Sequence, residues 1–325
     1  MRLARVANGA GLCALGLWVL LFVISRLEPA SPGVLVAYAP PVAVAVPPLV
    51  IATLALAVRA WRGMVAALLA GLFATFAWGR PALPVPRADA GDGRPLVVAT
   101  YNVDKWLHGV PAVAGAIRGF DADVVCLAEA GAYDWQTFDG PARLGQSLEG
   151  YRVVGEGELR IATRLPILGT RALSLAPGPA SRPLVEAVVE WRGRPVRIYA
   201  AHFVPTLLGS RWDESRGEAA GGDLAAIARV RLAQADRARD ALVAGQGPAV
   251  LCGDLNAPPA SAPIRRLAEV ATDAWTAGAG FGLTSPAPNA YVRLDYVFAR
   301  GLAPAHAEVS EVLASDHFAV VARLR

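Results

Sequence analysis

The sequence predicts a layered α/β domain that follows a helical membrane anchor. Apolar segments of helix length fill residues 1–79, a stretch rich in Pro, Gly and Ala covers residues 80–95, and apolar strand-like runs alternate with helical runs over residues 96–325. The hydrophobic fraction of 54% is also high for a purely soluble protein. We therefore expect a transmembrane anchor, a linker and one folded domain with these boundaries.

Three apolar segments make up the expected anchor, at about 9–27, 34–58 and 63–78. The first and third are near the length of about 20 residues that a helix needs to cross a bilayer core. The second contains proline pairs at 40–41 and 47–48, which could kink it. Because the segments lack a polar face, we expect a bundle of about three transmembrane helices rather than buried helices of a soluble fold. A cleaved signal peptide is the other alternative, and the two later segments argue against it.

Positive charges predict the orientation of this anchor. Arg2 and Arg5 precede the first segment, and Arg59 and Arg62 lie between the second and the third. If all three segments cross, these arginines share one side, which the positive-inside rule makes cytoplasmic. The chain would then be a multi-pass protein of the cell membrane with an extracytoplasmic domain. With two crossings, the domain would lie in the cytoplasm.

The charge balance gives no support for a non-specific nucleic-acid binder, which usually carries a basic stripe on its binding domain. Residues 1–95 hold 8 basic and 3 acidic residues, a net charge of +5, whereas residues 96–325 have a net charge of −1. The cysteines are equally uninformative about partners. Cys13, Cys126 and Cys252 all lie in apolar runs with no CxxC pair, so we expect buried, unpaired thiols and no structural zinc site.

Within the expected domain, strand-like and helical runs alternate. The strand-like runs are LVVATYNV, DVVCLAEA, EAVVEW, VRIYAAHF, PAVLCGDLN, RLDYVFAR and FAVVARLR. Helices are expected around 113–118 and over 223–244, the second with its arginines on a solvated face. EAVVEW and VRIYAAHF predict a hairpin joined by residues 192–195, without a standard two-residue turn.

Polar side chains stand where several of these apolar runs end. They are Asn102, Glu129, His202, and Asp254 with Asn256. Side chains at strand ends converge on one rim of a sheet and can form a site there. This pattern predicts a functional site at one edge of the domain.

In their order, these segments resemble the endonuclease/exonuclease/phosphatase superfamily, which includes pancreatic-type deoxyribonucleases, apurinic endonucleases, neutral sphingomyelinases and inositol polyphosphate 5-phosphatases. The matching motifs are TYNV, CLAEA, AAHF, GDLN, RLDYVF and SDH, spread over residues 97–325. Each motif is weak alone, but six in this order are specific. The resemblance implies a four-layer α/β sandwich of two mixed sheets flanked by helices. It also implies a divalent metal, usually Mg²⁺ with Mn²⁺ as a substitute, and in-line attack of water on phosphorus.

The resemblance further implies roles for the polar residues near the metal. Glu129 matches the metal-binding carboxylate of the family, and Asn102 and Asp316 match positions that support the metal or its waters. Asp254 matches the residue that orients or deprotonates the attacking water. Asn256 matches the residue that positions Asp254 and the phosphate.

Two histidines complete the implied site. Asp295 and His317 match an Asp–His pair, and His202 matches a histidine that contacts the phosphate. The sequence shows no clear carboxylate partner for His202. Ala128 stands where the family usually has Gln, although the carboxylate that follows is kept.

The expected function is therefore divalent-metal-dependent hydrolysis of a phosphoester, like that of a phosphodiesterase or nuclease, at a membrane-anchored domain. The substrate could be nucleic acid, and the alternative is a phospholipid headgroup or a small phosphoester. A different class of function is a catalytically inactive, membrane-tethered binding module. Retention of every expected acid and histidine argues against this class. The oligomeric state is left open.

Overall fold

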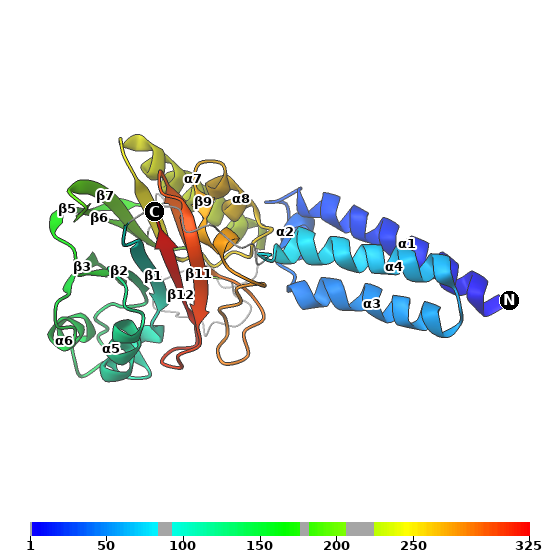
Figure 1. Ribbon diagram of the computed structural model, residues 1–325, viewed down its shortest axis with the longest axis horizontal. Coiled ribbons are helices and arrows are strands. Elements are labelled where there is room, and N and C mark those ends of the chain that lie inside the picture. Colours follow the sequence, from blue (N-terminus) through cyan, green and yellow to red (C-terminus); the bar gives the residue numbers. More distant parts are fainter. Residues whose placement is uncertain (1, 84–92, 176–181, 206–223) are drawn as a thin grey trace.

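The computed structural model describes residues 2–83, 93–175, 182–205 and 224–325, which form an elongated helical bundle and an α/β domain (Figure 1). The N-terminus lies at the free end of the bundle, and the C-terminus lies in the domain (Figure 1). The bundle consists of α1 (Arg2–Ser25), α2 (Ser31–Ala37), α3 (Pro41–Ala57), α4 (Trp61–Ala74) and the π-helical turn η1 (Thr75–Gly79).

Helices α1 and α4 approach each other closely because glycines face each other at their crossing. A Cβ atom on Gly11 would meet the backbone oxygen of Gly63 at 2.0 Å, and one on Gly63 would meet that of Ala7 at 2.3 Å. Asn8 adds a polar contact, since its Oδ1 accepts a hydrogen bond of 2.8 Å from the Gly63 amide. Small residues of this kind are typical of helix packing in membranes.

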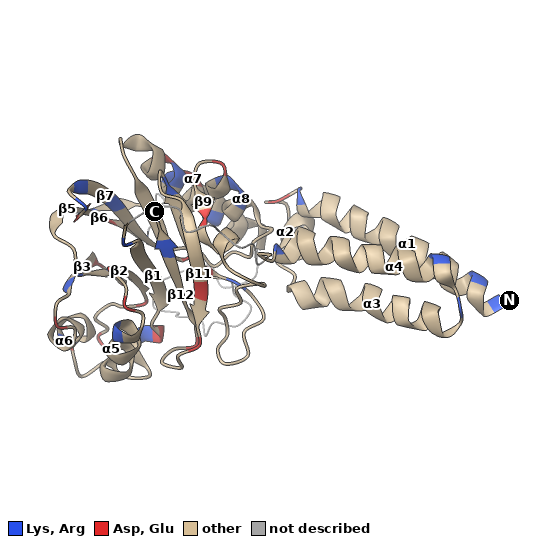
Figure 2. Cartoon of the chain, in the orientation of Figure 1, with Lys and Arg blue, Asp and Glu red and all other residues tan. Residues whose placement is uncertain are grey.

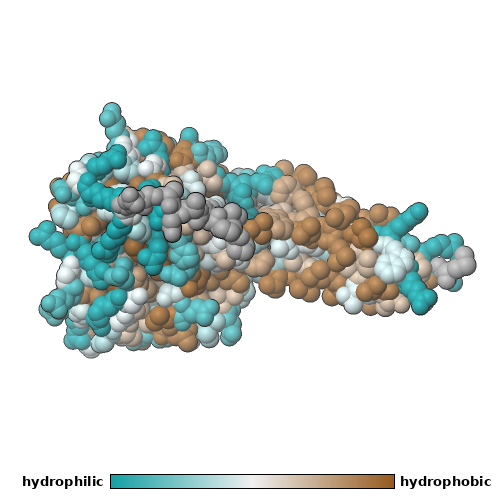
Figure 3. Space-filling view, in the orientation of Figure 1, coloured by the Kyte–Doolittle hydropathy of each residue, from teal (hydrophilic) through white to brown (hydrophobic). Residues whose placement is uncertain are grey.

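Two segments of the bundle are long and apolar enough to cross a membrane, Arg2–Ser25 and Trp61–Gly79. Helix α3 has 17 residues, includes Pro47 and Pro48, and is too short to join them. One or two apolar helices therefore qualify as a membrane anchor or signal sequence, and the expected third crossing is not supported. Apolar side chains gather along the bundle between its hydrophilic free end and the domain (Figure 3).

Two six-stranded mixed sheets form the centre of the domain. The first has the order β11-β12-β1-β2-β4-β3, and the second has the order β5-β6-β7-β8-β10-β9. The pairs β1/β2 and β7/β8 are parallel, and the other neighbours are antiparallel. The strands are β1 (Leu96–Asn102), β2 (Val124–Ala128), β3 (Arg152–Glu156), β4 (Leu159–Thr163), β5 (Ile167–Ser174), β6 (Pro183–Trp191), β7 (Arg194–His202), β8 (Ala249–Asp254), β9 (Thr272–Asp273), β10 (Asp295–Arg300), β11 (Pro304–Ser310) and β12 (Ala319–Leu324).

Helices cover the outer faces of both sheets, which confirms the predicted sandwich. α5 (Val110–Gly119) and α6 (Gly140–Ser147) share an apolar cluster with β1 and β2. α7 (Leu224–Ala244) and α8 (Ala262–Ala268) share another with β7 and β8. A third cluster lies between the sheets and includes Val98.

The prediction of unpaired thiols is wrong for two of the three cysteines. Cys126 on β2 and Cys252 on β8 form a disulfide with a Cα–Cα distance of 5.9 Å, which links the two sheets. They lie 126 residues apart in the chain, and only the stacking of the sheets brings them together. Cys13 is free as expected, but it is exposed on α1 rather than buried.

The hairpin of β6 and β7 has a tighter turn than the sequence suggested. Trp191 pairs with Arg194, so only Arg192 and Gly193 lie between the strands. Their φ angles are 55° and 70°, and positive φ at both central residues is the requirement of a type I′ turn. The expectation of a non-standard turn is therefore wrong.

Helix α7 spans the predicted region, but its arginines do not all lie on a solvated face. Arg231 is 1% exposed, and its Nε donates a hydrogen bond of 2.7 Å to the carbonyl oxygen of Val204. Its guanidinium also lies over the ring of Tyr38, next to α2. Arg231 therefore helps to join the bundle to the domain.

The base of the bundle also contacts the loop that follows β8. Glu28 Oε2 accepts a hydrogen bond of 2.6 Å from the amide of Ala262, at the start of α8. Arg80 Nη1 donates a hydrogen bond of 3.2 Å to the carbonyl oxygen of Pro259. Ala260 belongs to the apolar cluster of the bundle. The bundle thus holds a loop that begins at the end of a central strand.

Candidate functional site

Strand register brings the predicted polar residues to one edge of the domain. Asn102 pairs with Ala128, the residue before Glu129, and His202 pairs with Asp254. Asp295 pairs with Asp254 from the antiparallel strand β10. Asn256 follows β8, and both Asp316 and His317 precede β12, which is antiparallel to β1. All eight predicted residues therefore lie at this edge.

Asp254 is the centre of the edge and is 2% exposed. Its Oδ2 accepts a hydrogen bond of 3.1 Å from Asn102 Nδ2, and its Oδ1 accepts one of 2.9 Å from the backbone amide of Asn256. The Nε2 atoms of His202 and His317 lie 3.8 Å and 3.9 Å from Oδ2. One carboxylate is thus fixed in orientation between two imidazoles.

Glu129 lies beside this centre. Its Oε1 accepts a hydrogen bond of 3.2 Å from Asn102 Nδ2 and lies 3.9 Å from His202 Nε2. Its Oε2 lies 3.6 Å from Lys105 Nζ. The φ angle of Glu129 is 52°, and that of Asn256 is 48°. Non-glycine residues in this left-handed region are strained, and such strain clusters at functional sites.

Asp295 and His317 form the Asp–His pair that the sequence suggested. His317 Nδ1 lies 2.8 Å from Asp295 Oδ2, and its Nε2 lies 3.2 Å from Ser285 Oγ. Burial opposes a charge on the imidazole, but the carboxylates of Asp295 and Asp254 outweigh it and raise the pKa of His317 to about 10. Burial raises the pKa of Asp295. His317 is therefore a cationic imidazole beside the carboxylate of Asp295.

His202 has the carboxylate partner that the sequence did not reveal. Its Nδ1 lies 3.1 Å from Glu158 Oε1 and 2.9 Å from Arg182 Nη1, and Arg182 also pairs with Glu158. Burial opposes a charge on His202, but Glu158 outweighs it, so the pKa is raised. Nε2 is buried without a hydrogen-bond partner among the described residues, and it points to the Glu129–Asp254 side. A buried donor of this kind is suited to a ligand.

Asp104 adds another carboxylate to the edge. Its backbone amide donates a hydrogen bond of 3.0 Å to Asn102 Oδ1. Burial, together with the charges of Asp316 and Glu129, raises the pKa of Asp104 to about 6. Asp316 itself is exposed at the rim. Asp104 thus lies near enough to both Asp316 and Glu129 for their charges to repel its own, which a cation would relieve.

Two groups of side chains at the edge could hold a cation. Ligand atoms of Asp254, Asp295 and His317 all lie within 4.8 Å of one another. However, the raised pKa of His317 favours a protonated ring, which cannot bind a metal. The oxygen donors of Glu129 and Asn102, with the carboxylates beside them, better suit a hard cation such as Mg²⁺. The donor chemistry therefore fits the metal position expected from the sequence.

Three residues of the edge were not assigned a role from the sequence. Lys105 reaches Glu129 because residues 104–106 all have positive φ, which turns the chain back after β1. Glu158 lies in the turn between β3 and β4, and Arg182 stands just before β6. None of the three belongs to a motif, and only the packing of the sheets places them here. The signal available from the sequence, a polar residue where an apolar run ends, did not single out any of these three.

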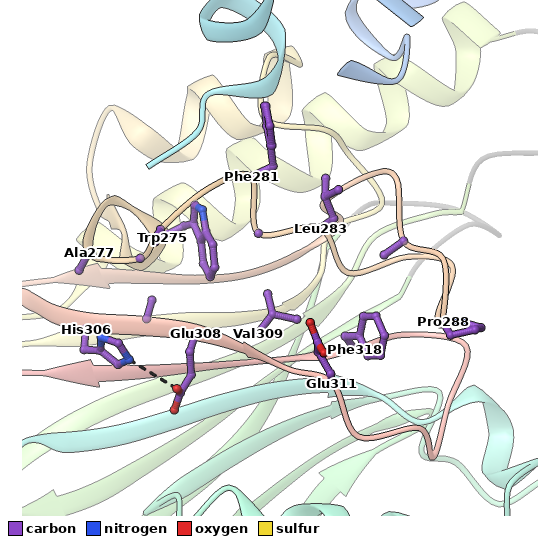
Figure 4. Close-up of a pocket in the computed structure, with 15 residues that line it drawn as sticks. Trp275, Ala277, Phe281, Leu283, Pro288, His306, Glu308, Val309, Glu311 and Phe318 are labelled. Carbon is purple, nitrogen blue, oxygen red and sulfur yellow. Dashed lines mark ion pairs between the residues drawn. The ribbon is translucent and has the colours of Figure 1, made fainter. Parts of the chain in front are cut away.

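A separate apolar cavity of about 840 Å³ lies between the loop after η4 (Ala274–Ala277) and β11 (Figure 4). Trp275, Phe281 and Phe318 line it, and His306 forms an ion pair of 3.5 Å with Glu308 on its wall. The eight predicted site residues do not line this cavity. The polar edge and the cavity are therefore different features.

Comparison with known proteins agrees with the fold and the motif order. The model of the Endonuclease/Exonuclease/phosphatase family matches residues 99–317. An endonuclease/exonuclease/phosphatase from Beutenbergia cavernae has a TM-score of 0.54 and 23% identity, over 72% of each chain. The mannosyl-6-phosphatase Bt3783 from Bacteroides thetaiotaomicron has a TM-score of 0.56 and 17% identity, over 71% of this chain and 99% of its own.

A humanized D. rerio TDP2 has a TM-score of 0.54 and 16% identity, over 71% of this chain and 98% of its own. Comparison with curated proteins finds no match. At these identities the solved structures establish a shared fold.

Proposed function

Because this chain belongs to the endonuclease/exonuclease/phosphatase family of phosphoester hydrolases, we propose that it is a membrane-anchored enzyme that cleaves a phosphoester with a divalent cation and an activated water. The supporting observation is the arrangement at Asp254. Asn102 and Asn256 fix both oxygens of this carboxylate, and the imidazoles of His202 and His317 lie within 4 Å of it. A fixed, buried carboxylate between two imidazoles is suited to accept the proton of an attacking water.

We assign the cation to Glu129, with support from Asn102 and Asp316, and Mg²⁺ or Mn²⁺ is the proposed ion. When bound, a divalent ion would neutralise charge on the non-bridging phosphate oxygens. Lys105 lies 3.6 Å from Glu129 Oε2 and contributes positive charge on the same side.

The remaining residues are proposed to bind and orient the phosphate. His317, held by Asp295, offers a cationic Nε2, and His202 offers its unpaired Nε2. Donors fixed before the reaction stabilise the charge that develops on a phosphoryl group. Asn256 positions Asp254 through its backbone amide, while its Nδ2 donates a hydrogen bond of 3.0 Å to the carbonyl oxygen of Phe203.

A lipid headgroup is the second candidate substrate beside nucleic acid. Large apolar side chains are exposed on loops that follow β1 and β2 and precede β12: Leu107 at 62%, Trp135 at 60% and Leu313 at 60%. Exposed apolar side chains near a polar site suit a substrate with an apolar part. Acidic and basic residues are mixed over the visible face of the domain, without a basic stripe (Figure 2).

We further propose the division into an anchor over 1–79, a linker over 80–95 and a catalytic domain over 96–325. We place the domain outside the cytoplasm, because α3 returns from the domain end of the bundle to its free end, so the N-terminus and the domain lie at opposite ends (Figure 1). Basic residues at the free end of the bundle support this orientation (Figure 2). The disulfide of Cys126 and Cys252 supports it as well, since disulfides persist in oxidising compartments.

The proposal is tested with the full chain in detergent micelles, because Glu28 of the anchor and Arg80 of the linker hold the loop after β8. Hydrolysis of bis(p-nitrophenyl) phosphate is measured with Mg²⁺ and with EDTA. We expect EDTA to abolish turnover and Asp254→Asn to lower kcat by about 100- to 10,000-fold. Asp240→Asn, an exposed change on α7, is the control and keeps full activity.

Turnover that persists in EDTA or in Asp254→Asn would reject the mechanism. Binding of a phosphoester in Mg²⁺ without turnover would favour a tethered binding module instead. Plasmid DNA, phospholipid vesicles and a sugar phosphate then separate the substrate classes.

A further inference from the structure

An apolar groove runs along the outside of the bundle between α1 and α4. Its volume is about 650 Å³. Its lining residues recur at helical spacing along each helix, and each row ends at an arginine. One row, along α1 and just beyond it, is Leu15, Val19, Phe22 and Arg26; the other, along α4 and η1 and just beyond them, is Leu69, Leu72, Phe73, Phe76, Ala77 and Arg80. Each set covers one face of its helix.

The groove has the length of one bilayer leaflet. Both helices run from the free end of the bundle toward the domain (Figure 1). The lining spans 15–26 on one helix and 69–80 on the other, which corresponds to about 16 Å at 1.5 Å per residue. The hydrocarbon core of a bilayer is about 30 Å thick, so one acyl chain layer has a similar depth.

Two guanidinium groups close the groove at the domain end. Arg26 lies with its guanidinium carbon 4.4 Å from the ring centroid of Phe22, and Arg80 donates its hydrogen bond to Pro259. Both side chains are exposed. The two charges are therefore held at fixed places but stay open to a ligand.

Positive charge is in excess at this end. Partial burial lowers the pKa of Arg26, and the charge of Arg80 lowers it further. Arg265 on α8 is a third cation, and its pKa is also lowered by burial and by these two arginines. The carboxylate that offsets them is Glu28, which already accepts a hydrogen bond from the Ala262 amide and lies 3.9 Å from Arg265. Among the residues that the structure describes, no carboxylate forms an ion pair with Arg26 or Arg80, so an anion would complement both.

We propose that this groove binds an anionic phospholipid, with an acyl chain along the apolar faces of α1 and α4 and the headgroup phosphate between Arg26 and Arg80. A long apolar groove and two guanidinium groups occur together here. A phospholipid has an acyl chain that fits the groove and a phosphate that pairs with the guanidinium groups. A zwitterionic lipid would bring an ammonium group into a site that already has excess positive charge.

This site is distinct from the proposed catalytic edge, and it has a consequence for the loop after β8. Arg80 would lie between the lipid phosphate and the carbonyl oxygen of Pro259, three residues beyond Asn256. A bound lipid would therefore fix Arg80 on both sides and stabilise the contact between membrane and domain.

The test is native mass spectrometry of the full chain released from detergent, with phosphatidylglycerol, phosphatidylcholine or diacylglycerol added. We expect phosphatidylglycerol to be retained about tenfold better than phosphatidylcholine, since charge-assisted hydrogen bonds supply a difference of this order. Diacylglycerol, which lacks the phosphate, should be retained least. The double variant Arg26→Gln/Arg80→Gln should lose the preference.

A matched control is Arg59→Gln/Arg62→Gln, which removes two exposed arginines at the opposite end of α4 and should keep the preference. Arg26→Gln alone leaves the Pro259 contact intact and should weaken phosphatidylglycerol retention in a chain that folds normally. Val19→Trp fills the groove and should reduce retention of all three lipids.

Equal retention of phosphatidylglycerol and phosphatidylcholine would overturn the proposal, as would an unchanged preference in both Arg26 variants. Inorganic phosphate is the last ligand to be tested. If it displaces phosphatidylglycerol and raises Tm as much as the lipid does, the arginines form a simple anion site and the lipid assignment is wrong.

Discussion

Nδ1 of His202 lies 3.1 Å from Oε1 of Glu158, and the two residues belong to different sheets. His202 ends β7 in the second sheet, whereas Glu158 lies in the turn between β3 and β4 of the first. The stacking of the sheets thus supplies the charge that favours a proton on His202. Its Nε2 is then a donor facing the carboxylates of the site.

Glu158→Gln should lower kcat/KM by about 10- to 100-fold, because it removes a hydrogen bond to a charged group that orients His202. Loss of the Glu158 charge also lowers the pKa of His202, so the alkaline limb of the pH–rate profile should move to lower pH. Steady-state rates across the pH range check both effects. Glu156→Gln, exposed on β3, is the control. A profile for Glu158→Gln that overlays the wild type would contradict this role.

Removal of the cation should destabilise the folded chain as well as inactivate it. Burial raises the pKa of Asp104, and the carboxylates of Asp316 and Glu129 repel its charge and raise the pKa in the same direction. Adding Mg²⁺ at about 100 times its Kd should therefore stabilise the wild type by about 2.7 kcal/mol, measured as a rise in Tm. Glu129→Gln should remove most of this rise, and Glu308→Gln, at an exposed position on β11, should not. A Tm that does not respond to Mg²⁺ would argue against a cation at this edge.

The disulfide predicts a specific pattern of thiol reactivity. Under denaturing, non-reducing conditions, alkylation should add one group, at Cys13, and after reduction it should add three. Intact-mass measurement distinguishes these states. Cys126→Ala/Cys252→Ala should lower the unfolding free energy by up to about 5 kcal/mol, since the closed loop is long. Three reactive thiols before reduction would show that the sheets are not covalently joined.

Local patterns in the sequence predicted a layered α/β domain and the polar residues where its strands end, and the resemblance to the family implied the sandwich and the other edge residues. Strand-like runs that end in Asn102, Glu129, His202 and Asp254 mark the sheet edge directly. The partners of those residues depend on stacking between sheets. Glu158 belongs to no recognisable motif, and Cys126 and Cys252 are too far apart in the sequence for their disulfide to be predicted from it.

Local backbone geometry also could not be predicted from the sequence pattern. The turn at Arg192 and Gly193 requires positive φ at both residues, and arginine gives little indication of that conformation. The sequence predicted a solvated side chain for Arg231, because helical periodicity does not show which other elements pack against a helix face. Tyr38 at the base of the bundle and the carbonyl oxygen of Val204 in the domain both contact it, and it is buried between them.

Glu28 should make the contact between the helical bundle and the domain sensitive to pH. Burial raises its pKa from 4.5 to about 7, and the Ala262 amide and Arg265 offset this only in part. The folded state therefore binds more protons than the unfolded state, so stability should fall as pH rises from about 4.5 through 7, by up to about 3 kcal/mol.

Glu28→Gln keeps the oxygen that accepts the Ala262 hydrogen bond and removes the titration. This variant should match the wild type in mild acid and exceed its Tm above pH 7. Thermal unfolding of the full chain across this range is the measurement, with Glu149→Gln, exposed after α6, as the control. If wild type and Glu28→Gln keep a constant difference in Tm at every pH, then the buried carboxyl does not titrate between 4.5 and 7, and the junction is not pH-sensitive through this residue.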